Sequence, residues 1–250
     1  GVESGRLLDP ACGSGSFLMA ALYMAWKNAS FGSDETGLPD SAVAPGEPDG
    51  WWGRDSLFSD WLRQATERIV GWDRNGLAVL AARANWLLAL GPWIDPSEEI
   101  QISVFQQDAI LPARSEATTD RPASFDFVVG NPPWLVWDQL EPAYREATMP
   151  LWRCYGLFSL SAKDARHGGA KKDLAGLMTY TAADRYLKPD GRLAMLLPNS
   201  LLHTQGAGDG FRRFCLPDGT PLKVAAVEDF SQVRLFGNSA QRTTVLVLEK

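Results

Sequence analysis

Short apolar runs alternate along most of the chain with longer segments whose apolar residues recur at helical spacing. The short runs predict strands, because they are bounded by turn residues and are too short for helices. We expect strands at residues 5–10, 68–73, 101–107, 125–130, 192–198, 223–230 and 243–250. The other segments predict helices at 17–28, 57–67, 75–90, 173–187 and 208–215. This alternation indicates a doubly wound α/β sheet, with the last two strands as an antiparallel pair.

The composition narrows the class of protein. The chain has 250 residues, 45% hydrophobic and 22% charged, as in soluble globular domains. It has no apolar run of the roughly 20 residues that span a bilayer, and no signal-peptide pattern. Three cysteines and two histidines without metal-ligand spacing predict a reducing cytoplasm and no metal. The net charge of −6 argues mildly against a chain that wraps nucleic acid by itself, because phosphate contacts need lysine and arginine.

The fourth predicted strand ends in the tetrapeptide Asn131-Pro132-Pro133-Trp134. Two prolines stop the strand, so an amide side chain and an aromatic ring are expected at its carboxyl end. Ligands bind at the carboxyl ends of strands in open α/β sheets. The tetrapeptide is therefore a candidate site, and a tight turn that merely contains Asn and Pro is the alternative.

A glycine-rich turn joins the first predicted strand to a helix. Residues 9–17 of this turn read Asp-Pro-Ala-Cys-Gly-Ser-Gly-Ser-Phe. Gly13 and Gly15 allow a tight turn and a close approach of the backbone to a ligand. The start of the following helix offers free N–H groups to a carboxylate or phosphate. The turn does not end in Gly-Lys-Ser/Thr, so it is not a phosphate-binding loop of that kind.

Acidic residues close the second and third predicted strands. Asp73 stands where a carboxylate accepts hydrogen bonds from ribose hydroxyls in dinucleotide-binding folds. It lies further from the glycines than the usual distance of about 20 residues, which an expected surface insertion at 30–53 explains. Asp108 is placed to accept the amine of an adenine ring. A helix N-cap for Asp73 and a turn residue for Asp108 are the alternatives.

The segment 135–172 is aromatic and has no clear periodicity. We expect it on the substrate side, where a basic cluster contacts phosphates or forms a solvated loop. The cluster consists of Lys163, Arg166, Lys171 and Lys172.

Taken together, these motifs resemble the gamma class of N6-adenine DNA methyltransferases over nearly the whole chain. The resemblance rests on the glycine-rich turn, the two strand-end acids, Asn-Pro-Pro-Trp, and a later Asp-Leu-x-x-Leu…Leu-Lys-Pro-Asp-Gly-Arg-Leu that begins at Asp173, in that order. It implies a Rossmann-like fold of the S-adenosylmethionine (SAM)-dependent methyltransferases, with a mostly parallel seven-stranded sheet and an antiparallel last strand.

The resemblance also assigns residue roles. Residues implied to bind the cofactor are Asp9, Ala11, Cys12, Gly13, Gly15, Phe17, Asp73, Asp108 and Met178. The implied catalytic loop is Asn131, Pro132, Pro133 and Trp134. Within this loop Asn131 and Pro132 would hold the target amine, and Trp134 would stack on the target base. Phe236 would pack on the flipped base.

SAM is the implied cofactor, and double-stranded DNA is the implied substrate in a bacterial cytoplasm. Subunits of restriction or phage-defence systems are implied partners, and neither a membrane nor a metal is implied. Residues 1–250 would form one catalytic domain. Because the family's short segment before the SAM loop and its target-recognition domain after Lys250 are missing here, we expect an excised catalytic core that contacts DNA largely through other regions.

Other functions fit the same pattern less well. The Asn-Pro-Pro-Trp loop also suits an RNA base or a protein glutamine amide, although those relatives usually have fewer insertions. A non-catalytic SAM-binding or DNA-binding subunit would have no chemical need for an intact loop. A nicotinamide dehydrogenase would leave the loop unexplained, and the third glycine of its turn is missing.

Overall fold

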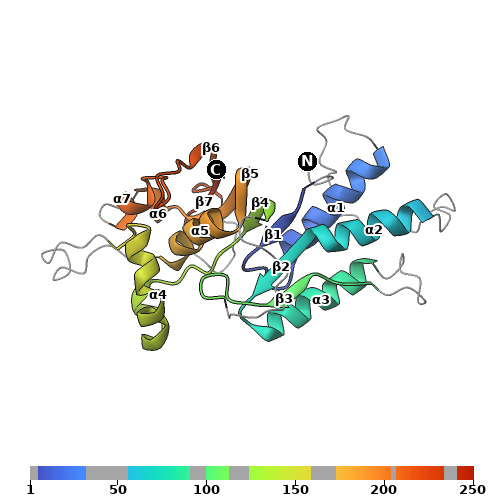
Figure 1. Cartoon of the computed structure of the whole chain (residues 1–250), viewed down its shortest axis with the longest axis horizontal. Coiled ribbons are helices and arrows are strands. Elements are labelled where there is room, and N and C mark those ends of the chain that lie inside the picture. Colours follow the sequence, from blue (N-terminus) through green and yellow to red (C-terminus); the bar gives the residue numbers. More distant parts are fainter. Residues whose placement is uncertain are drawn as a thin grey trace, which may run out of the picture.

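A seven-stranded sheet forms the centre of the molecule (Figure 1). The computed structural model describes residues 5–31, 56–90, 100–112, 124–158, 173–203, 207–233 and 241–250. The strands are β1 (Leu7–Asp9), β2 (Ile69–Asp73), β3 (Val104–Gln106), β4 (Phe125–Gly130), β5 (Leu187–Pro198), β6 (Lys223–Asp229) and β7 (Thr243–Glu249). Their order is β3-β2-β1-β4-β5-β7-β6. Strands β1 to β5 run parallel, and β7 lies antiparallel between β5 and β6, so the predicted sheet is confirmed.

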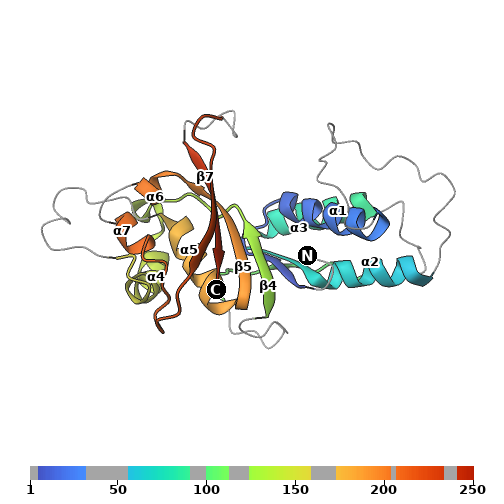
Figure 2. The ribbon, with the colours of Figure 1, turned by 90° about the horizontal axis from the view of Figure 1, so that it is seen from above.

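Helices cover both faces of this sheet. They are α1 (Ser16–Phe31), α2 (Ser56–Arg68), α3 (Gly76–Leu90), α4 (Pro142–Cys154), α5 (Leu174–Arg185), α6 (Ser200–His203) and α7 (Ala207–Phe211). Figure 2 shows α1, α2 and α3 on one side of the strands and α4 to α7 on the other. None of the described helices is long and apolar enough to cross a bilayer.

Two hydrophobic clusters fill the layers between the sheet and its helices. In β1, Leu7 belongs to the cluster beneath α1–α3 and Leu8 to the cluster beneath α4–α7. In β2, Ile69 and Val70 divide in the same way. Successive side chains of a strand point to opposite faces, so a sheet covered on both sides needs apolar residues at every position. This requirement explains the continuous apolar runs of β1 and β2, whereas β6 is mostly exposed.

Helix α4 is an element that the sequence pattern did not predict. It begins at Pro142, which suits the first turn of a helix because the missing N–H has no partner there in any case. A second proline, Pro150, lies inside the helix. Proline in a helix interior removes a backbone hydrogen bond and normally argues against a helix. The buried side chains of Thr148 and Trp152 hold α4 against the core nevertheless.

Two other boundaries differ from the prediction. β5 begins at Leu187, which pairs with Phe125, and regular pairing resumes where Arg192 lies beside Phe127. Asp190, with φ of 63°, turns the chain between these two points. The helix expected near 208–215 is the short α7 alone. Residues 32–53 of the expected insertion, the basic cluster of 163–172 and Phe236 lie outside the described residues.

Asp173 is the N-cap of α5, which begins at Leu174, close to the predicted start at residue 173. Its carboxylate accepts a hydrogen bond of 2.9 Å from the backbone N–H of Ala175. Burial raises the pKa of Asp173 to about 6, while the bond from Ala175 opposes the shift. Burial therefore makes the ionised Asp173 carboxylate less stable than it would be in water. Protonation of the carboxyl at acidic pH removes this cost.

We expect Asp173→Ala to lower the free energy of unfolding by about 1 kcal/mol, because a helix N–H loses its acceptor. Urea denaturation at pH 7 measures this loss. Asp173→Asn is the matched control, since its amide oxygen keeps the cap without a buried charge. Equal destabilisation by both substitutions would show that the cap bond is not the cause.

Candidate active site

A cavity of about 600 Å³ lies at the carboxyl ends of the parallel strands. Its walls include residues that directly follow four strands: Pro10 and Ala11 after β1, Asp73 to Asn75 at the end of β2, Gln107 to Ala109 after β3, and Asn131 and Pro133 after β4. The remaining walls come from Leu135, Leu140, Glu141, Tyr144, Leu174 and Met178. This is the edge at which open α/β sheets bind ligands.

The glycine-rich turn is fixed to the end of β2. Gly13 and Gly15 have φ of 54° and 90°, a region that favours glycine. The N–H of Gly13 donates to Asp73 Oδ2 at 2.9 Å, and the N–H of Cys12 donates to the Trp72 carbonyl at 2.8 Å. These bonds hold the turn beside the cavity while Ala11 forms part of its wall.

Asp73 joins two strand ends rather than capping a helix. Its Oδ2 receives the Gly13 N–H, and its Oδ1 receives the N–H of Asn75 at 2.8 Å. The side chain of Asn75 in turn accepts the N–H of Leu77 at 3.0 Å, so Asn75 takes the capping position at the start of α3. Asp73 lines the cavity and is partly exposed, which leaves the outer side of its carboxylate open to a ligand.

Asp108 is held by three donors on one oxygen. Its Oδ1 accepts the backbone N–H groups of Ile110 and Leu111, at 2.8 and 3.0 Å, and the hydroxyl of Tyr144 at 3.2 Å. Both the turn and the cavity position considered from the sequence are therefore present. The Asp108 Oδ2 lies 3.9 Å from Arg74 Nε, within ion-pair distance.

Tyr144 and Arg74 are site residues that the sequence did not single out. The Arg74 guanidinium lies 4.5 Å from the centre of the Tyr144 ring, and both residues line the cavity. Burial and the neighbouring Asp108 raise the pKa of Tyr144, so its hydroxyl remains a donor. No local signal reveals this group, because Tyr144 comes from α4 and Arg74 follows β2.

Asp9 and Cys12 lie inside the protein rather than on the cavity wall. Asp9 is fully buried, its Oδ1 accepts the N–H of Ala11 at 3.1 Å, and its Oδ2 has no hydrogen-bond partner among the described residues. Burial raises the pKa of Asp9 to about 7. Gly130 passes directly over it, since a Cβ there would come within 2.8 Å of Asp9 Oδ1. Burial raises the pKa of the Cys12 thiol to about 12, so it stays a protonated, inert group.

The Asn-Pro-Pro-Trp loop divides between the cavity and the core. Asn131 lines the cavity, and its buried Oδ1 has no hydrogen-bond partner within the described parts of the chain. Pro132 is buried, and Pro133 contributes to the wall. The indole N–H of Trp134 donates to the Leu196 carbonyl of β5 at 3.3 Å. The Trp134 ring is partly buried against the core, so its predicted stacking on a base stays a prediction.

The structure therefore brings together some predicted site residues and separates others. Those that line the cavity are Ala11, Asp73, Asp108, Asn131, Pro133 and Met178. Asp9, Cys12, Gly13, Gly15, Phe17, Pro132 and Trp134 do not line it. The first five belong to the glycine-rich turn, where a side chain that points into the core can still place the backbone next to a ligand. Phe236 lies outside the described residues.

The sequence profile of the Eco57I restriction-modification methylase family matches residues 67–232, which include the ends of β2 to β4 and the Asn-Pro-Pro-Trp loop. This chain belongs to that family. A search of curated proteins found no match.

Solved structures share the fold of this chain at low sequence identity. A Listeria monocytogenes protein described as a class I SAM-dependent methyltransferase superimposes with a TM-score of 0.54 at 16% identity, over 98% of this chain and 53% of that protein. A type I restriction-modification methyltransferase subunit from Streptococcus thermophilus superimposes with a TM-score of 0.52 at 20% identity, over 98% of this chain and 39% of that subunit.

A nuclease-deletion mutant of the Type ISP restriction-modification enzyme LlaGI, solved with a DNA substrate mimic, gives a TM-score of 0.59 at 13% identity, over 98% of this chain and 20% of that one. The chain described here thus spans about half or less of the length of these structures. The predicted SAM-dependent methyltransferase fold is confirmed.

The buried Asp9 predicts an unusual pH dependence of stability. Its pKa is raised from 3.8 to about 7 in the folded protein, so the folded state binds the proton more tightly than the unfolded state. The resulting contribution to stability is fully present below pH 3.8 and is lost as the pH rises through 7.

We expect Asp9→Asn to remove a decline in unfolding free energy of roughly 4 kcal/mol between pH 4 and pH 8, taking about 1.4 kcal/mol for each unit of pKa shift. Urea denaturation of both proteins at several pH values measures the difference. Parallel stability curves for wild type and variant would contradict the assignment of a neutral, buried Asp9.

Proposed function

We propose that this chain binds SAM and transfers its methyl group to the N6 amine of an adenine in DNA. The observation that carries the proposal is the buried Asn131 Oδ1, an acceptor without a partner among the described residues, at the end of β4 in the wall of the cavity. A buried acceptor left without a donor costs about 1–3 kcal/mol, so an unpaired one in a cavity calls for a functional explanation.

The cavity has the groups that a nucleoside cofactor with a charged amino-acid tail requires. Asp73 offers carboxylate oxygen to ribose hydroxyls, and Asp108, whose Oδ2 lies 3.9 Å from Arg74 Nε, offers its carboxylate to the amine of an adenine ring. Met178, on α5, supplies an apolar surface for that ring. The glycine-rich turn lies beside the cavity and contributes Ala11 to its wall. These features support SAM, which would supply an activated methyl group.

The catalytic task of the protein is to make a poor nucleophile react. The lone pair of an aromatic amine is shared with its ring. Asn131 Oδ1 and the Pro132 carbonyl can each accept one N–H of that amine, which favours tetrahedral geometry and localises the lone pair. Two aligned acceptors also stabilise the positive charge that develops on the nitrogen during the transfer. Because positioning and electrostatics suffice, the mechanism needs no nucleophilic side chain.

An adenine in a duplex must leave the base stack before its amine can reach Asn131. Flipping costs a few kcal/mol. Stacking on an aromatic side chain contributes about 1–3 kcal/mol, and Trp134 is the aromatic residue of this loop. The family match and the restriction-modification neighbours favour DNA as the substrate and restriction subunits as partners, in a bacterial cytoplasm.

We expect Asn131→Ala to abolish methyl transfer while SAM affinity changes less than about threefold, because the amide acts on the substrate amine. The protein is expressed in a host that lacks adenine methylation, and the genome is read by modification-sensitive single-molecule sequencing. N6-methyladenine at one short motif, absent with Asn131→Ala, is the expected result.

Asn131→Asp is the matched control, since it keeps an acceptor oxygen in place and should retain part of the activity. Loss of SAM binding together with transfer in Asn131→Ala would show that Asn131 is structural. Unmodified host DNA would point to an RNA base or a protein amide, which labelled SAM would reveal in total RNA and protein.

We expect Asp108→Asn to weaken SAM binding about tenfold or more, because hydrogen bonds to charged groups are worth about 1.5–3 kcal/mol. Isothermal titration calorimetry measures the dissociation constant. Asp138→Asn is the control, since Asp138 is exposed and does not line the cavity. An unchanged affinity in Asp108→Asn would place the cofactor's adenine elsewhere.

A further inference from the structure

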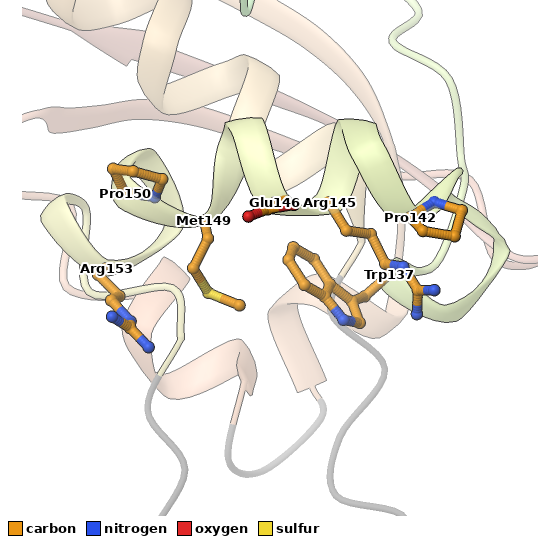
Figure 3. Close-up of a pocket in the computed structure, with 7 residues that line it drawn as sticks. All are labelled: Trp137, Pro142, Arg145, Glu146, Met149, Pro150 and Arg153. Carbon is orange, nitrogen blue, oxygen red and sulfur yellow. The ribbon is translucent and has the colours of Figure 1, made fainter.

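Helix α4 has two different faces. Thr148 and Trp152 lie on the face that packs into the core. A second hollow, of about 680 Å³, lies over the other face and is walled by Trp137 and by Pro142, Arg145, Glu146, Met149, Pro150 and Arg153. The α4 residues recur at three and four positions, as one face of a helix does. Figure 3 shows Met149 and Arg153 toward one end of the hollow and Trp137 with Arg145 toward the other.

The chemistry of this hollow favours an anion with apolar parts. Arg145 is half-buried and Arg153 is exposed, and within the described residues no ion pair joins either of them to a carboxylate. Trp137 is braced by edge contacts with Trp152, whose ring centre lies 5.5 Å away, and with Phe158 at 5.4 Å. A braced indole between two arginines offers a flat apolar surface beside positive charge. Glu146 is the single acidic residue in the wall.

The hollow adjoins the active-site cavity. Glu141 and Tyr144 line the cavity, whereas their neighbours Pro142 and Arg145 line the hollow. The first turn of α4 therefore separates the two, and a polymer with one unit in the cavity can lay its adjoining units against the hollow. A small molecule bound in the cavity would not extend across this turn to the hollow.

We propose that the hollow on α4 binds the sugar-phosphate backbone of the DNA strand whose base enters the cavity, with phosphates on Arg145 and Arg153. This inference rests on the proposed function. Eight residues of α-helix rise about 12 Å, which matches the rise of three to four nucleotides at about 3.4 Å each along one strand. Arginine binds phosphate with a planar pair of donors, and Trp137 packs against the sugar or base between the two contacts.

Each of the two arginines also has an alternative role that does not involve DNA. Arg153 lies in the last turn of α4, where a positive charge also complements the helix dipole. Arg145 can keep the helix surface solvated. Neither of these roles would change how DNA affinity depends on salt.

The test is the double variant Arg145→Gln with Arg153→Gln, assayed by fluorescence anisotropy with a labelled duplex over a series of salt concentrations. A phosphate contact contributes about 1 to the slope of log affinity against log salt, so the slope should become shallower by about 2. Affinity at low salt should fall at least fivefold, to a similar extent for unrelated DNA sequences. SAM affinity, measured on the same protein, should stay unchanged, and thermal stability should fall only slightly, because the charge of Arg153 at the end of α4 is removed.

Arg192→Gln is the matched control. It removes one exposed positive charge from β5, six residues before the strand's carboxyl end, and should leave the slope unchanged. An unchanged slope in the double variant overturns the proposal, as does a wild-type protein that binds no DNA at any salt concentration. The methylation result with Asn131→Ala is read independently, because a wild type that binds DNA but leaves it unmodified refutes the proposed function and not the phosphate contacts.

Discussion

The hydrogen bond from the Gly13 N–H to Asp73 joins the ends of two neighbouring parallel strands, and the cavity of the candidate active site depends on that junction. Parallel strands bring polar residues to one edge of a sheet, yet they do not by themselves fix the distance between loops. Here a carboxylate accepts the backbone of the glycine-rich turn, and the turn has the positive φ that this approach requires. The outer side of the same carboxylate remains available to a ligand.

A second group of contacts connects the cavity to the layer formed by α4. The Tyr144 hydroxyl reaches Asp108, and the Arg74 guanidinium lies on the Tyr144 ring. A helix that follows the Asn-Pro-Pro-Trp loop thereby touches residues that follow β2 and β3. Its outer face carries Arg145 and Arg153. One helix thus borders both the place proposed for the cofactor and the surface proposed for the DNA strand.

The site also contains groups that weaken the fold. Asp9 is a fully buried carboxyl whose Oδ2 has no partner among the described residues, and Asn131 Oδ1 shares that condition. Ordinary folding physics selects against such groups, because buried polar atoms are normally paired. Both residues lie where β1 and β4 end, side by side in the sheet. Asn131 lines the cavity, where a ligand can supply the missing donor, whereas Asp9 lies beneath Gly130 and away from the cavity wall.

The sequence by itself determined the sheet and the cavity residues that directly follow its strands. Continuous apolar runs mark strands buried on both faces, and Asp73 and Asn131 stand at the ends of such runs, whereas Asp108 follows the alternating run of the third strand. Only the tertiary structure decided the rest. Helix α4 escaped the periodicity because it contains Pro150. The place of Tyr144 in the site depends on contacts between distant segments, which local spacing does not encode. Local spacing also does not encode the direction of a side chain at a turn, so it did not show that the side chains of Asp9 and Cys12 point inward.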